Sequence, residues 1–377
     1  MRIAYVLASL GIGGAERQVV ALAERMAKRG HAVALLVLLP RLPEEWSTSV
    51  EAVHLNMRKT PASLLRAIIG GRRFLRAFHP DLVHSHGFHG NLMARLFRLL
   101  NCAPLVLSTL HNDGERSRIR MLAYRLTDGL SRRTTAVCEA AALAYVRVNA
   151  VPKEKCTVVT NGIDTVEFGP DPERRARVRA QLNAGGAFVW LAAGRIVPAK
   201  DFPNLLRAFA QVQAAQPSTR LWIAGEAEAL KHEVVSALAV ELGVADAVHW
   251  LGLRRDLPAL LDAADGFVLG SAWEGMPLAV GEAMAMGKIV AATDVGGMRE
   301  LLGAAGAMAP AKDPAALAQA MLGLMSKSPE ERRALGCAAR ERVIQSFSMD
   351  AKADEWEALY RSLLASGARR GLRIPEW

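Results

Sequence analysis

The sequence has few cysteines, and they do not cluster. The four of them are Cys102, Cys138, Cys156 and Cys337. Their scattered positions show neither the close pairing of a zinc site nor the dense spacing of a disulfide framework. We therefore expect a protein of a reducing cytoplasm whose fold rests on its hydrophobic core.

Long apolar runs are also missing. No stretch reaches the roughly 18 uninterrupted apolar residues that a membrane-spanning helix needs. The apolar run Ile3–Leu10 follows Arg2, but it is short and passes into Gly11–Glu16 without a cleavage-like site. This pattern favours a first β-strand over a signal peptide.

Neither a fixed-period repeat nor a low-complexity tract occurs. With 51% hydrophobic residues, 22% charged residues and 31 glycines, the composition is that of a globular α/β protein. The length of 377 residues is too great for one ordinary domain and fits two domains of about 150–200 residues each.

The net charge of +10 is unevenly distributed along the chain. Residues 1–170 hold 23 Lys and Arg residues against 13 Asp and Glu residues, whereas residues 171–377 hold 24 of each. The whole excess lies in the first half. This asymmetry predicts an anionic partner for that half, either a membrane surface or an acidic polymer.

Two stretches of the first half are especially basic. Along Pro61–Phe78, apolar residues and arginines interleave with helical spacing. We expect a helix there, either packed on the protein surface or lying on a membrane, with a break at Gly70–Gly71 as an alternative. The segment Glu115–Arg133 is the densest basic run, and solvated helix faces explain it equally well.

The chain opens with a strand, a glycine loop, a helix and a second strand. We place the first strand at Arg2–Ala8, the helix at Ala15–Arg29 and the second strand at Ala32–Leu39. This order is a βαβ unit of a parallel sheet. The loop Gly11–Gly14 is followed by Glu16 where a dinucleotide fingerprint has its third glycine, so a tight turn with close helix packing is an alternative to ligand binding.

Histidines lie at the ends of two later strands. Asp81–His86 ends a strand, and alternation places His84 and His86 on one face of it. No carboxylate or cysteine completes a metal-ligand set with them, so we expect no metal there. Another strand, Pro104–Leu110, is followed by His111. Ligands bind at the carboxyl ends of parallel strands, which makes His111 a candidate site residue; a capping or core histidine is the alternative.

The second half begins with a charged, proline-bearing stretch, Gly169–Arg179, which reads as an interdomain linker. A second sheet starts at residues 188–193 and leads into Gly194–Asp201. Arg195 and Lys200 there follow a strand end and precede a helix. Two cations at one sheet edge fit a pyrophosphate group, with ordinary surface charge as the alternative.

The most informative stretch is Leu269–Arg299. A short strand runs into the loop Gly270–Gly275, Pro277 opens a helix, and Gly287 ends it.

Two carboxylates flank the start of this helix. Glu274 falls in the loop and Glu282 in the second helical turn, with the free N–H groups of the helix N-terminus between them. Such an arrangement fits a ligand with hydroxyls at both ends and phosphates between, as in a nucleotide sugar. Two solvated charges are the alternative.

This stretch resembles the retaining GT-B glycosyltransferases of family 4. The resemblance lies in the pattern S-x-W-E-G-x-P-L-x-x-x-E-A-M-A-x-G, in the G-R-x-x-x-x-K segment Gly194–Lys200 and in the turn Asn161–Asp164. It runs from Met1 to about Phe347. It implies an α/β fold of GT-B type, with two Rossmann-like doubly wound domains facing a deep cleft.

The resemblance also implies a division of labour between the domains. Residues 1–168 would form the N-terminal acceptor-side domain, and residues 169–349 the C-terminal nucleotide-sugar donor domain. A last helix at about 350–377 would cross back onto the first domain. Glu274 and His111 match catalytic positions of the family, and His86 is assigned to the acceptor side. The implied donor-binding residues are Gly13, Gly14, Arg195, Lys200, Leu253, Arg254, Met276, Pro277, Leu278 and Glu282.

The implied activity is transfer of a sugar, with retention, from a nucleotide-diphosphate sugar, with UDP preferred. The acceptor would be a glycan or lipid-linked oligosaccharide of bacterial surface polysaccharide biosynthesis. The alternatives are a sugar-nucleotide 2-epimerase and an inactive nucleotide-sugar-binding module of the same fold. We expect a cytoplasmic protein that associates peripherally with anionic membrane, at the inner face of the plasma membrane, through residues 60–133, and no nucleic-acid partner.

We also expect no cofactor and no essential metal. Many glycosyltransferases hold a divalent ion against the leaving diphosphate with an Asp-x-Asp motif, and the sequence contains none. Arg195, Lys200 and the helix N-terminus after Glu274 would supply the positive potential in its place.

Overall fold

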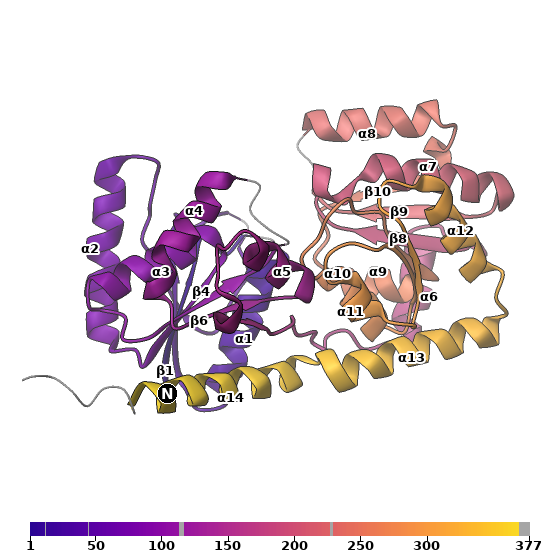
Figure 1. Ribbon diagram of the computed structural model, residues 1–377. Helices are drawn as coiled ribbons and strands as arrows, with labels where there is room; N and C mark the ends of the chain where they lie inside the picture. The colour runs from indigo at the N-terminus through magenta and orange to yellow at the C-terminus, as the bar shows by residue number, and fades with distance from the viewer. Residues whose placement is uncertain (12, 44, 113–116, 227–228, 369–377) are drawn as a thin grey trace, which may run out of the picture. The chain divides into compact units, whose positions relative to one another are not determined.

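The computed structural model describes the chain except for residues 12, 44, 113–116, 227–228 and 369–377. Its internal contacts divide it into two units (Figure 1). The first comprises Met1–Gly162 and the C-terminal segment that begins at Met349, and the second comprises Ile163–Ser348. Each unit is built on one parallel sheet, which confirms the expected α/β class.

The first unit holds a seven-stranded sheet in the order β3-β2-β1-β4-β5-β6-β7. Its strands are β1 Arg2–Leu7, β2 Ala32–Val37, β3 Glu51–His54, β4 Leu82–His86, β5 Val106–Leu110, β6 Arg133–Ala136 and β7 Cys156–Val158. All neighbouring strands pair in parallel. The order reverses between β1 and β4, and ligands bind at the carboxyl ends of the strands at such a switch point.

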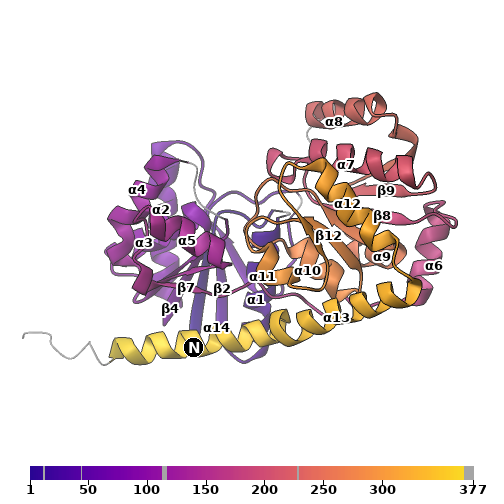
Figure 2. The same ribbon diagram turned by 45° about the vertical axis from the view of Figure 1, so that its right-hand side comes forward.

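Six helices accompany this sheet among the described residues. They are α1 Gly14–Lys28, α2 Pro61–Phe78, α3 Gly87–Leu99, α4 Arg118–Thr127, α5 Glu139–Arg147 and α14 Met349–Ala368. The chain's last helix, α14, lies beside α1 (Figures 1 and 2). Arg29, the C-cap residue of α1, forms an ion pair with Glu357 of α14 at 3.1 Å. Trp356 and Tyr360 of α14 join the core that packs on β1.

The second unit holds a six-stranded parallel sheet in the order β10-β9-β8-β11-β12-β13. Its strands are β8 Val189–Ala193, β9 Arg220–Ala224, β10 Val248–Gly252, β11 Gly266–Leu269, β12 Ile289–Thr293 and β13 Ala307–Ala309. Its helices are α6 Pro172–Gln181, α7 Phe202–Ala215, α8 Ala229–Glu241, α9 Leu257–Ala263, α10 Leu278–Ala285, α11 Met298–Leu302, α12 Pro314–Met325 and α13 Pro329–Phe347. Here the strand order reverses between β8 and β11.

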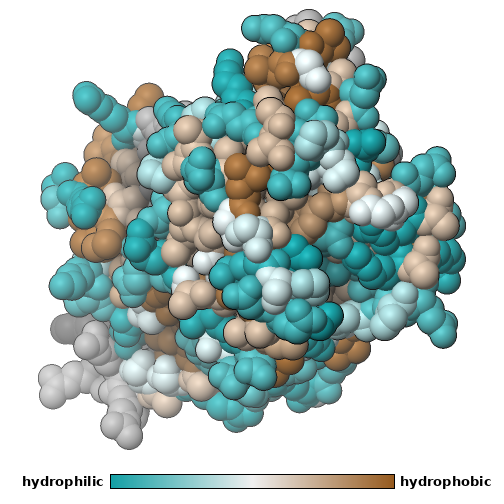
Figure 3. Space-filling model, turned by 90° about the vertical axis from the view of Figure 1, so that its right-hand side faces the viewer, coloured by the Kyte–Doolittle hydropathy of each residue, from teal (hydrophilic) through white to brown (hydrophobic). Residues whose placement is uncertain are grey.

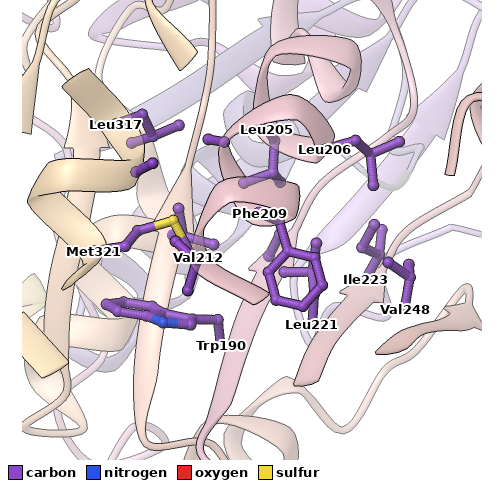
Figure 4. Packing of buried hydrophobic residues seen from close by; sticks show 14 of the residues in the cluster. Trp190, Leu205, Leu206, Phe209, Val212, Leu221, Ile223, Val248, Leu317 and Met321 are labelled. Carbon is purple, nitrogen blue, oxygen red and sulfur yellow. The ribbon is translucent and has the colours of Figure 1, made fainter. Parts of the chain in front are cut away.

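One core of this unit forms where α7 and α12 cover the sheet (Figure 4). Val212 of α7 and Met321 of α12 lie near Trp190 of β8, and Phe209 of α7 lies beside Leu221 of β9. These side chains are buried, so the strands of this sheet pack closely against α7 and α12.

The linker prediction for Gly169–Arg179 is wrong. Most of that stretch is helix α6 of the second unit. Asp171 caps it by accepting from the amides of Glu173 and Arg174, and Pro172 opens it. Arginines of α6 then form ion pairs at and just after the end of α9, Arg174 with Asp262 and Arg175 with Asp265, the latter at 2.6 Å. The density of charge that reads as a solvated linker is therefore an ion-pair network.

The alternative of a break in α2 is also wrong, because the helix runs without interruption. The reason for Gly71 is packing: a Cβ there would lie 2.3 Å from the ring of Phe97 in α3. Glycine thus lets α2 approach α3 closely without ending the helix.

The helices of the described residues include none that is both long and apolar enough to cross a membrane. On the face drawn in Figure 3, hydrophobic residues occur in separate areas among hydrophilic ones. The basic run predicted to begin at residue 115 starts inside the undescribed residues 113–116, and the end of the predicted last helix, residues 369–377, also lies outside the described residues.

Candidate active site

The switch point of the second unit brings two predicted loops together. Gly194–Lys200 follows β8, and Gly270–Pro277 follows β11, the neighbouring strand. The two loops therefore leave the same edge of the sheet side by side, and the amide of Ala272 donates to the carbonyl of Ala199 at 2.8 Å. The sequence placed both motifs at strand ends but could not show that the strands are adjacent.

An ion pair connects these loops across the switch point. Lys200 Nζ lies 2.6 Å from Glu274 Oε1, and the Ser271 hydroxyl donates to the same oxygen at 2.6 Å. Both charged side chains are mostly shielded from solvent, with exposed fractions of 20% for Lys200 and 12% for Glu274. In this state the lysine's charge is neutralised by the glutamate.

The Glu274 loop is held in place by its backbone. The hydroxyl of Thr293 donates to the carbonyl of Ser271 at 2.6 Å, and the amide of Gly297 donates to the carbonyl of Gly275 at 2.7 Å. Gly296 packs so closely that a Cβ there would lie 2.2 Å from the carbonyl oxygen of Glu274, and its φ of +56° also requires glycine. The loop is therefore pre-organised.

Helix α10 begins where the sequence places it. Pro277 is the N-cap residue and makes no side-chain hydrogen bond to the first turn. Glu282 lies in the second turn and is buried, with 5% of its surface exposed. Gly287, with a φ of +67°, follows the helix end. Of the other predicted residues here, Met276 and Pro277 are buried and Leu278 is half-buried.

The other predicted donor residues of this unit lie in exposed or half-buried loops. Arg195 is exposed, next to Gly194 at the end of β8. Leu253 and Arg254 follow β10, on the far side of β9 from β8. The guanidinium of Arg254 makes two hydrogen bonds to Asp256, and this contact lowers the pKa of the Asp256 carboxyl.

In the first unit, the predicted glycines lie at the start of α1. Gly13 is the N-cap and Gly14 the first helical residue. A Cβ at Gly13 would lie 2.2 Å from Glu16 Oε2, so glycine leaves room for that side chain. The loop follows β1, beside the switch point of the first sheet.

Three histidines form a cluster at the ends of β4 and β5. His86 Nδ1 lies 3.0 Å from His111 Nε2, and the rings of His84 and His86 are 4.1 Å apart. Burial lowers the pKa of His111 to about 4 and holds the pKa values of His84 and His86 well below the usual value. All three are therefore neutral at pH 7. The described residues include no group of histidine, cysteine or carboxylate side chains placed to hold a metal ion.

Sequence reasoning missed some residues that support these sites. Ser271 is one, although its position three residues before Glu274 was a usable signal. Tyr360 is another: its hydroxyl lies 2.7 Å from His84 Nδ1, across 276 residues of sequence. No local pattern could have predicted that contact.

Comparison with known proteins agrees with this geometry. The sequence-family model for Glycosyltransferase Family 4 matches residues 12–167, and the family model for Glycosyl transferases group 1 matches residues 187–327. A D-inositol 3-phosphate glycosyltransferase of Segniliparus rotundus is 30% identical over 330 residues, which cover 83% of this chain and 72% of that protein. This chain belongs to glycosyltransferase family 4.

Other similarities place the family 4 chain among related glycosyltransferases. The UDP-Gal:alpha-D-GlcNAc-diphosphoundecaprenol alpha-1,3-galactosyltransferase of Escherichia coli is 26% identical over 59% of this chain and 60% of its own length. The matches to curated relatives span between 50% and 90% of those proteins. The crystal structure of Anabaena Alr3699/HepE with UDP and glucose superposes with a TM-score of 0.83 at 20% identity, covering 96% of this chain and 100% of that one. This likeness confirms the GT-B fold.

Proposed function

We propose that this family 4 chain transfers a sugar from a nucleotide-diphosphate sugar, preferably a UDP-sugar, to a glycan or lipid-linked acceptor with retention of configuration. The observation that carries the proposal is the Lys200–Glu274 ion pair at the β8–β11 switch point, with Arg195 on the same sheet edge. The similarity to Alr3699/HepE, solved with UDP and glucose, supports the choice of donor.

The donor diphosphate would replace Glu274 as the partner of Lys200. Arg195 would bind it as a planar fork, and the N-terminal end of α10 would add a partial positive charge. Glu282, in the second turn of α10, would bind the ribose hydroxyls. The backbone of Leu253 and Arg254 would contact the nucleobase.

Release from Lys200 would leave the Glu274 carboxylate to orient hydroxyls of the transferred sugar. His111 would bind the sugar, and the glycine loop at Gly13 and Gly14 would lie near the donor phosphate and the acceptor. Met276, Pro277 and Leu278 would bring the start of α10 against the diphosphate.

The reaction would break the bond between the anomeric carbon and the diphosphate oxygen. The acceptor oxygen would form its new bond on the same face of the sugar and pass its proton to the departing phosphate oxygen. Positive charge already aimed at that phosphate lowers the barrier, because the charge develops there as the bond breaks.

We further propose that no divalent metal is essential. The sequence has no Asp-x-Asp motif, and Arg195 and Lys200 supply cations to the diphosphate. Enzyme treated with EDTA should keep its activity. Loss of activity that returns with Mn²⁺ or Mg²⁺ would refute this part of the proposal.

The acceptor is proposed to belong to bacterial surface polysaccharide biosynthesis and to be reached at an anionic membrane. Support comes from α4, where Ile119, Leu122 and Leu126 are exposed by 79%, 52% and 76%. Their spacing puts them on one helix face, and the exposed Arg118 and Arg125 lie on the same helix. Such a face fits the headgroup region of an anionic bilayer.

His86, at the end of β4, is proposed to lie on the acceptor side of the site.

The test is a donor screen followed by a transfer assay. Thermal shift against UDP-, GDP- and ADP-sugars identifies the donor, because a ligand that binds the folded state raises its stability. Radiolabelled transfer to an acceptor mixture, with NMR of the product, then reports activity and anomeric configuration. Retained configuration supports the proposal, and inversion contradicts it. Conversion of the donor to its 2-epimer would support the epimerase alternative, and donor binding without turnover would support the binding-module alternative.

A further inference from the structure

The hydrogen bond between His86 and His111 carries one proton. Both rings are neutral at pH 7, since burial lowers both pKa values. The bond joins Nδ1 of His86 to Nε2 of His111 at 3.0 Å. One of these nitrogens must donate and the other accept, so the tautomers of the two residues are coupled.

The second nitrogen of His86 decides which one donates. His86 Nε2 is buried and has no hydrogen-bond partner among the described residues. Buried N–H groups without an acceptor are rare in proteins, and rarer than unmet acceptors. The proton of His86 therefore belongs on Nδ1, from which it is donated to His111.

This assignment fixes His111 as well. With Nε2 accepting, a neutral His111 ring carries its own proton on Nδ1. The residue then presents an N–H donor at Nδ1, where the opposite tautomer would present a lone pair.

The surroundings of His86 hold its ring in the required orientation. The ring of His84, whose centroid lies 4.1 Å from that of His86 in a tilted contact, is hydrogen-bonded on both nitrogens, to Tyr360 Oη and to Thr109 Oγ1, each at 2.7 Å. The ring of Trp356 also lies against His84, with a distance of 4.6 Å between the ring centroids. Two residues of the C-terminal helix α14 thus pack against His84, which in turn packs against His86.

We propose that His86 is a positioning residue that fixes His111 in its Nδ1–H tautomer, so that His111 offers a neutral hydrogen-bond donor to an oxygen of the transferred sugar. The contact with sugar rests on the proposed function. The tautomer assignment rests on the geometry of the first unit alone.

The experiment measures the tautomer directly. Long-range ¹H–¹⁵N correlation spectra of protein labelled with ¹⁵N-histidine distinguish a protonated Nδ1 from a protonated Nε2, and His111→Asn assigns the His111 signals. The wild type should show His111 protonated at Nδ1 at pH 7. His111 protonated at Nε2 would overturn the proposal, whatever the activity.

Two substitutions of His86 separate positioning from shape. His86→Asn keeps an N–H near the place of Nδ1, and His86→Phe keeps a flat ring without a hydrogen bond. His86→Phe should move the His111 signals toward the Nε2–H tautomer and lower kcat about tenfold, the effect of about 1.4 kcal/mol on the barrier, with KM for the donor within about twofold. His86→Asn should restore both the wild-type tautomer and most of kcat.

A surface variant serves as the control. His79→Asn changes an exposed histidine with a φ of +48°, a conformation that asparagine tolerates, and should leave the His111 signals and kcat unchanged. If the tautomer follows His86 as expected but kcat does not, the positioning role is refuted while the donor site of the second unit is untouched. If His86→Phe does not fold, the wild-type spectrum and His86→Asn still decide the tautomer.

Discussion

The two sheets differ in charge at the edge formed by the carboxyl ends of their strands. In the second unit, the edge at β8 and β11 carries full charges, with Lys200 neutralised by Glu274 and Arg195 exposed beside it. In the first unit, the edge at β4 and β5 carries neutral histidines, joined by a hydrogen bond between His86 and His111.

This difference runs against the overall distribution of charge. The first 170 residues hold the entire net charge of +10, yet the histidine cluster of their sheet is uncharged. Much of the positive charge is on the outer helices, such as Arg72 and Arg73 of α2 and Arg118 and Arg125 of α4, all exposed. Net charge therefore indicates what a surface attracts, whereas the pairing of individual residues indicates what a site binds.

The largest effect should come from the charged edge. Glu274→Gln keeps the shape of the side chain but removes the carboxylate, and kcat should fall about 100- to 1,000-fold, the range for loss of one electrostatic contact to a transition state. Initial rates at saturating donor give the value. Glu241→Gln, an exposed glutamate at the end of α8, is the control and should match the wild type. A kcat within threefold of the wild type for Glu274→Gln would remove that residue from the chemistry.

The neutral histidines should make the first unit less stable as the pH falls. The pKa values of His84, His86 and His111 are lowered in the folded state, so below about pH 6.5 the unfolded chain binds protons that the folded chain does not. The stability these residues contribute is complete above pH 6.5 and is lost as the pH falls, for His111 down to about pH 4. Between pH 6.5 and 5, the unfolding free energy of the first unit should fall by up to about 1.4 kcal/mol per pH unit for each histidine.

Urea titrations at several pH values measure this slope, with the transitions of the two units fitted separately because a two-unit chain need not unfold in one step. His111→Asn removes one of the three groups and should flatten the slope. A first-unit stability independent of pH over this window would contradict the neutral cluster.

The strands and helices that line both edges could largely be predicted from the sequence. Apolar runs gave the strands next to the site loops, and Pro277 and Gly287 gave the bounds of α10. The order of the strands could not be predicted, because it depends on long-range pairing, and so the contact between Lys200 and Glu274 was not foreseen as an ion pair. The charged residues of Gly169–Arg179 were misread as a linker, because Asp262 and Asp265, whose carboxylates pair with Arg174 and Arg175 of α6, lie about 90 residues later in the chain. The roles of the predicted site residues remain predictions.

The smallest effect concerns the outer surface of the first unit. Arg118→Ala and Arg125→Ala should each weaken binding to anionic vesicles about fivefold at low salt, which corresponds to about 1 kcal/mol per arginine near such a surface. The effect should shrink as salt rises. Vesicle flotation measures it. Val234→Ser, an exposed residue of α8 in the second unit, is the control and should change nothing. Binding that ignores both salt and these arginines would refute the membrane proposal.

The central claim is that a nucleoside diphosphate opens the Lys200–Glu274 pair and takes its place on Lys200. Calorimetry of UDP binding to Lys200→Ala, Glu274→Gln and the control Lys327→Ala tests it most directly. Lys200→Ala should lose about 1.5–3 kcal/mol of binding free energy, the usual value of a charge-assisted hydrogen bond. Glu274→Gln should bind UDP as tightly as the wild type or more tightly, because the lysine no longer has to leave a carboxylate, and Lys327→Ala should match the wild type. Equal weakening by Lys200→Ala and Glu274→Gln, or no change with Lys200→Ala, would contradict the claim and place the diphosphate elsewhere.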